Sequence, residues 1–65
     1  MPIVRLEMLS GRSQEQLNEL AEVLTRETAR IARCKTTDVQ VVISEFDRSR
    51  WAVGGVIGKP ATTPS

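Results

Sequence analysis

The chain has 65 residues, a net charge of +1, no histidine, no tyrosine and a single cysteine. This composition excludes an internal disulfide, a histidine-based triad, a zinc site and the basic surface that binds nucleic acid. With no signal segment and no apolar run near 18 residues, we expect a cytoplasmic protein without a membrane partner.

The first predicted element is a strand over residues 2–9, in which apolar and polar side chains loosely alternate. Gly11 marks a turn, and Ser13 followed by Gln16 three residues later is the pattern of a capping box. Apolar side chains at helical spacing then predict one long amphipathic helix. The recurring positions are Leu17, Leu20, Ala21, Leu24, Thr28, Ile31 and Ala32.

Residues 38–46 are dense in β-branched side chains and predict a second strand, buried on both sides and parallel to the first. Residues 51–58 predict a short hairpin that turns at Gly54-Gly55. We therefore expect an α/β fold in which a β-α-β unit precedes a C-terminal hairpin. It forms a single domain over residues 1–65, ordered from about 2 to 58, with a flexible tail at 59–65.

A fold of this size needs further stabilisation. A chain this short buries only about 60% of its unfolded surface. One helix also covers only one face of a two-stranded sheet, so the other face must meet another subunit. We expect a closed homo-oligomer, most simply built from two-fold dimers.

The composition also limits which group can act as a base near neutral pH. Without histidine, the α-amino group has the reference pKa nearest neutrality, at about 7.7–8.0. A general base working near pH 7 is most efficient with a pKa close to 7. Parallel strands begin at the same end of a sheet, so the chain start at Pro2 should lie beside Gln40.

Four features form a set that resembles the 4-oxalocrotonate tautomerase family of small tautomerases. They are Pro2, the turn Gly11-Arg12-Ser13, Trp51 and the pair Gly54-Gly55. The similarity extends over residues 2 to about 58. The resemblance implies a cofactor-independent, metal-free tautomerase or isomerase acting on a small unsaturated 2-hydroxy or 2-oxo acid.

The resemblance also implies roles for individual residues. Met1 is removed, and the free amine of Pro2 is the general base that moves a proton along the conjugated chain. Arg12 binds the substrate carboxylate, Trp51 walls the pocket, and the backbone N–H of Leu9 assists at the substrate oxygen. The resemblance further implies that the dimers associate into a hexamer. Sites of this kind lie between subunits, with Pro2 and Arg12 supplied by different chains.

Gln40 departs from the family pattern, because the best-known members carry a second arginine there. Losing a charged donor at that place costs on the order of a few kcal/mol of transition-state stabilisation. Arg5 and Arg50 are candidate substitutes, although no spacing argument places them in the pocket. Gln40 is thus compatible with a different acid substrate, a weak promiscuous activity, or a mixed oligomer whose partner chain supplies the arginine.

Two other functions remain open at this point. On the same fold, hydration or dehalogenation of an unsaturated acid would use Pro2 as an acid and a carboxylate, Glu45 or Asp47, to activate water. The second open function is that of a scaffold, or of a subunit that depends on a partner chain and has little activity alone. Each candidate residue also has a structural interpretation: Trp51, for example, would equally fill a subunit contact.

Overall fold

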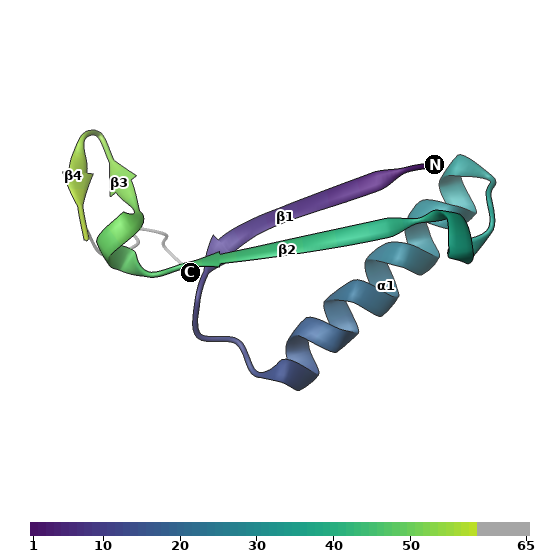
Figure 1. The fold of residues 1–65 in the computed structure, drawn as a ribbon, viewed down its shortest axis with the longest axis horizontal. Helices are drawn as coiled ribbons and strands as arrows, with labels where there is room; N and C mark the ends of the chain where they lie inside the picture. The colour runs from purple at the N-terminus through teal and green to yellow at the C-terminus, as the bar shows by residue number, and fades with distance from the viewer. Residues whose placement is uncertain (59–65) are drawn as a thin grey trace.

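The computed structural model describes residues 1–58, which form a β-α-β unit followed by a small hairpin (Figure 1). The predicted fold is therefore confirmed, whereas the tail expected at 59–65 lies outside the described residues. The strands are β1 (Ile3–Leu9), β2 (Gln40–Phe46), β3 (Ala52–Val53) and β4 (Val56–Ile57). The helices are α1 (Gln14–Ala32) and two short 3-10 turns, η1 (Thr36–Asp38) and η2 (Arg48–Arg50).

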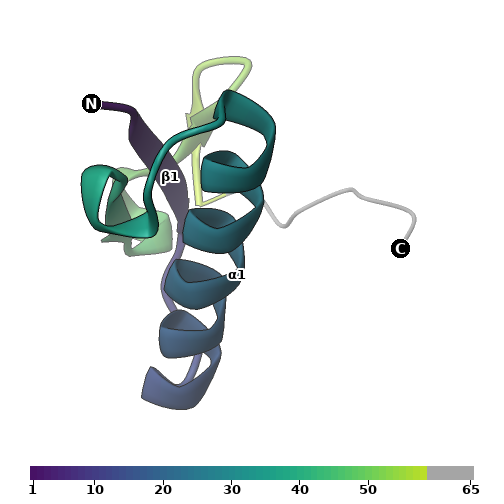
Figure 2. The same ribbon diagram turned by 90° about the vertical axis from the view of Figure 1, so that its right-hand side faces the viewer.

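β1 and β2 pair in parallel over their whole length, from Ile3 opposite Gln40 to Leu9 opposite Phe46. α1 connects them and lies along one face of this two-stranded sheet (Figures 1 and 2). Alternate side chains of both strands are half-buried beneath it, as the period of a strand requires. These side chains are Val4, Leu6, Met8, Val41 and Ile43.

The predicted capping box fixes the start of α1. The Oγ atom of Ser13 accepts a hydrogen bond from the backbone N–H of Gln16 at 3.2 Å. In return, the backbone N–H of Ser13 donates to the side-chain oxygen of Gln16 at 2.9 Å. Together these bonds satisfy two donors that a helix start otherwise leaves without partners.

The core of the single chain is small. Among residues 1–58, Ala29 is the only buried residue, at 6% exposure. Ile31, which the sequence pattern placed on the apolar face of α1, is instead 69% exposed. Ile31 follows Ala29 by two residues, about 200° around the helix, so it lies on the side of the last turn that faces away from the buried Ala29.

The sheet face opposite α1 has no covering element in the part of the chain that the structure describes. Ile3 and Val42 on this face are 57% and 44% exposed. Residues 38–46 are therefore not buried on both sides within one chain, contrary to the expectation from their composition. The hairpin β3–β4 projects from the far end of the sheet, with Val53, Val56 and Ile57 exposed (Figure 1).

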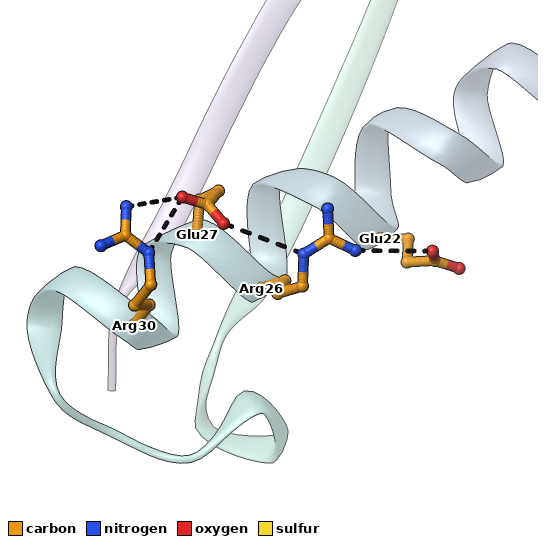
Figure 3. A network of polar contacts seen from close by, with 4 residues as sticks. All are labelled: Glu22, Arg26, Glu27 and Arg30. Atoms are coloured by element: carbon orange, nitrogen blue, oxygen red, sulfur yellow. Dashed lines mark hydrogen bonds and ion pairs between the residues drawn. The ribbon is translucent and has the colours of Figure 1, made fainter.

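Charged residues on the exposed side of α1 form a short network (Figure 3). The Nη1 atom of Arg26 lies 4.0 Å from Oε1 of Glu22, and its Nε atom lies 3.8 Å from Oε2 of Glu27. The Nη2 atom of Arg30 lies 2.7 Å from Oε1 of Glu27. The hydrogen bond and charge of Arg30 lower the pKa of the Glu27 carboxyl below its ordinary value. All four side chains are well exposed, so we assign the network to helix stability and not to a binding site.

Candidate functional site

The five candidate residues fall into two groups at opposite ends of the β1–β2 sheet. Pro2 precedes β1 and Gln40 begins β2, at the end where the chain starts (Figure 1). Leu9 ends β1, and Arg12 and Trp51 follow the far ends of the two strands. The length of β1, roughly 20 Å, therefore separates Pro2 from Arg12 within one chain.

At the first end, the backbone N–H of Gln40 donates a hydrogen bond to the carbonyl oxygen of Pro2 at 3.0 Å. This bond continues the parallel ladder by one residue and fixes Pro2 against the start of β2. It does not involve the ring nitrogen. Pro2 is half-buried, whereas Gln40 is exposed and Met1 is 81% exposed.

At the other end lies a pocket of about 560 Å³, a size typical of small-molecule sites. Three of the predicted site residues, Leu9, Arg12 and Trp51, line it together. The remaining lining residues come from β1 and its end, the end of β2, and the segment that follows β2. They are Glu7, Met8, Ser10, Phe46, Asp47 and Arg48.

A tight turn places Arg12 at this pocket. The backbone N–H of Ser10 donates to the carbonyl oxygen of Phe46 at 2.8 Å, which ties the end of β1 to the end of β2. Gly11 then adopts a φ of 131°, a conformation open to glycine but strained for other residues. Arg12 is thus held between this turn and the cap of α1 at Ser13.

Trp51 is positioned by its aromatic neighbour and by the backbone of η2. Its ring centroid lies 6.2 Å from that of Phe46, with the ring planes tilted by 52°, a favourable arrangement for an aromatic pair. Its backbone N–H donates to the carbonyl oxygen of Arg48 at 3.1 Å. The indole is half-buried and forms one wall of the pocket.

Arg48 lines the pocket, although sequence reasoning did not single it out. Side chains three apart eclipse one another in a 3-10 turn, so η2 places Arg48 and Trp51 on the same side. The two substitutes considered earlier, Arg5 and Arg50, are not among the lining residues. The Nη1 atom of Arg50 instead donates to the carbonyl oxygen of Ser49 at 3.4 Å. The spacing R-x-x-W in the sequence indicates that Arg48 lies beside Trp51, but only when a 3-10 turn is known to be present at these residues.

The pocket also contains carboxylates. Glu7 and Asp47 line it, whereas Glu45 does not. The Oδ2 atom of Asp47 accepts a hydrogen bond from the Oγ atom of Ser49 at 3.2 Å. The residues that line the pocket thus include two arginines, two acidic residues and several apolar residues.

Neither a metal cluster nor a membrane-spanning helix is found in the part of the chain that the structure describes. Within residues 1–58, no group of three or more histidine, cysteine, aspartate or glutamate side chains is arranged to hold a metal ion. Within the same residues, no helix is both long and apolar enough to span a bilayer.

Comparison with known proteins identifies relatives over nearly the whole chain. A family model described as "Tautomerase enzyme" matches residues 2–59, which include both ends of the sheet. A probable tautomerase of Lactiplantibacillus plantarum is 37% identical over 57 residues, covering 88% of this chain and 89% of that protein.

Solved structures of related proteins are also similar to this chain over most of its length. A 4-oxalocrotonate tautomerase homologue has a TM-score of 0.84 at 33% identity, covering 89% of this chain and 92% of the other. A heterohexameric 4-oxalocrotonate tautomerase from Chloroflexus aurantiacus J-10-fl has a TM-score of 0.82 at 36% identity, covering 89% and 94%.

Proposed function

The chain belongs to the tautomerase family, and from that membership we propose that it is a cofactor-independent tautomerase or isomerase of small unsaturated 2-hydroxy or 2-oxo acids. The observation that carries the proposal is the pocket that gathers Leu9, Arg12 and Trp51. A permanently charged guanidinium holds a carboxylate through two parallel hydrogen bonds, and an indole wall limits access of water. The backbone N–H of Leu9 is assigned to the substrate oxygen.

The proposed base is the secondary amine of Pro2 after removal of Met1, whose 81% exposure makes it accessible to an aminopeptidase. The lone pair of the amine takes the proton of the hydroxyl group that is attached to carbon 2 of a dienol. The electrons of that O–H bond form the carbonyl, the conjugated double bond shifts, and the amine returns the proton to a carbon further along the chain. The proton is conserved, and the amine is regenerated.

A complete site needs two copies of the chain, because β1 holds Pro2 roughly 20 Å from Arg12. We propose that Pro2 of one copy enters the pocket of another, in dimers that associate into a hexamer. The exposed apolar side chains of Ile3, Val42 and Ile57 support such an assembly, since water contact with them is unfavourable.

Ketonisation of phenylenolpyruvate and 2-hydroxymuconate by the purified chain, followed by ultraviolet absorbance, tests the proposal. Mass spectrometry first verifies that Met1 is absent. We expect turnover of at least one acid, and a loss of about 100-fold in kcat for Pro2→Ala, within the range that general bases contribute. The same turnover by Pro2→Ala and the unaltered protein, or no turnover of either acid, would contradict the proposed function.

A hydratase or dehalogenase is the second candidate, favoured by the position of Asp47 in the pocket. In that reaction the protonated amine of Pro2 acts as an acid, and the Asp47 carboxylate takes a proton from the attacking water. The prediction separating it from tautomerisation is that Asp47→Asn abolishes water addition and leaves ketonisation intact. Glu45→Gln is the matched control, because Glu45 lies outside the pocket.

A partner-dependent subunit is the third candidate, favoured by the uncharged side chain of Gln40 at the end of the sheet where Pro2 lies. In this case a different chain supplies the arginine that Gln40 replaces, in a mixed oligomer. The chain alone then assembles but turns over neither acid, and activity appears only on addition of the partner.

A further inference from the structure

We propose that Arg48 is a second anion-binding residue of the pocket and gives it a preference for acids with two carboxylates over acids with one. The inference rests on the proposed function, because it concerns the same pocket. Arg12 and Arg48 both line a space of about 560 Å³, together with Trp51. Two permanent positive charges at one small site favour a ligand with two negative groups.

The two arginines reach the pocket from separate parts of the backbone. Arg12 lies in the turn between β1 and α1, whereas Arg48 begins η2, after β2. η2 is closed by backbone hydrogen bonds from Arg50 to Asp47 at 2.9 Å and from Trp51 to Arg48 at 3.1 Å. A closed turn limits the directions that the Arg48 side chain can take, so the pocket is lined by two arginines from independently fixed segments.

The uncharged side chain of Gln40 is a reason to expect that the positive charge of Arg48 is used in substrate binding. At the Pro2 end, the amide of Gln40 can donate hydrogen bonds but carries no charge. Arg12 alone therefore supplies one guanidinium to a substrate that enters the pocket, and Arg48 supplies the other from the same wall. The negative charges of Glu7 and Asp47 oppose anion binding, which predicts that Glu7→Gln strengthens the binding of a diacid.

The test compares two acids of equal chain length, 2-oxoadipate and 2-oxohexanoate, which differ by the terminal carboxylate. Trp51 is the only tryptophan of the chain and lines the pocket, so its fluorescence reports binding without turnover. We expect Arg48→Gln to weaken the binding of 2-oxoadipate about tenfold, as loss of a charge-assisted hydrogen bond does, and that of 2-oxohexanoate less than about twofold.

Two variants separate this role from a structural one. Arg50→Gln removes a guanidinium from the same 3-10 turn but outside the pocket, so it should leave both affinities unchanged. Arg48→Lys keeps the charge and should retain part of the preference for the diacid.

The role of Arg48 would be overturned if Arg48→Gln weakened the binding of both acids equally, or if Arg50→Gln weakened the binding of 2-oxoadipate as much as Arg48→Gln does. The unaltered protein binding the two acids equally, or binding neither, would overturn it as well. The proposed function fails by a different result, turnover that does not depend on Pro2, so the two failures are distinguishable.

Discussion

Pro2 and Gln40 are linked through the backbone at the start of the two parallel strands, with 3.0 Å between the N–H of Gln40 and the carbonyl oxygen of Pro2. The link is independent of the Gln40 side chain, which is exposed. A substitution at residue 40 therefore changes the chemistry beside Pro2 without breaking the ladder that positions it.

Gln40→Arg should raise kcat/KM for 2-hydroxymuconate by about tenfold, because a charged donor stabilises the negative charge that develops on the enolate oxygen. Steady-state kinetics by ultraviolet absorbance measures the change. Gln40→Met changes the same side chain without adding a charge and should not raise kcat/KM. An unchanged or lower kcat/KM for Gln40→Arg would show that residue 40 does not contact the reacting acid.

Among the elements, α1 connects stability to the site, because its capping residue directly follows Arg12. Ser13→Ala removes the acceptor for the backbone N–H of Gln16 and should lower the free energy of unfolding by about 1 kcal/mol. Denaturant titration measures this loss. Ser13→Asp keeps a capping oxygen and should retain most of the stability, and an equal loss in both variants would contradict the capping role.

The ion pairs on α1 make a small, pH-dependent contribution. The lowered pKa of Glu27 means that its stabilising effect is present above the ordinary pKa of glutamate and is lost as pH falls through the lowered value. Glu27→Gln should therefore slightly reduce the free energy of unfolding near pH 7, and the reduction should be lost progressively as pH falls from the ordinary pKa of glutamate through the lowered value.

Denaturant titrations near pH 7 and at a series of acidic pH values measure that loss. Glu19→Gln is the control, since Glu19 forms no ion pair among the described residues and should show a smaller change. A Glu27→Gln effect that persists at low pH would show that charge is not its cause.

The order of elements was predictable from the sequence, since local patterns specify it. Ser13 and Gln16 mark the helix start, and Gly54-Gly55 marks the hairpin turn. The place of Arg48 was not predictable, because residues 47–51 show no periodicity and only the 3-10 turn relates Arg48 to Trp51. The exposure of Ile31 was not predictable either, because a helical pattern does not show which side of the last turn is covered.

For the whole molecule, the single chain is incomplete in packing and, by our proposal, in chemistry. Ala29 alone is buried among residues 1–58, and an apolar sheet face and hairpin remain exposed. Assembly would cover these surfaces and bring Pro2 of one copy to Arg12 of another. The expected burial of residues 38–46 on both sides is not met in one chain, because no described element covers the sheet face opposite α1.

The central claim is that each site is shared between copies, and complementation of two inactive variants tests it most directly. Pro2→Ala and Arg12→Ala chains are unfolded together, refolded as a mixture and assayed for ketonisation. Random association pairs an intact Pro2 with an intact Arg12 at about a quarter of the sites, so we expect activity near that fraction of the unaltered protein. Activity no higher than that of the separately refolded variants, although size-exclusion chromatography shows mixed oligomers, would contradict the shared site.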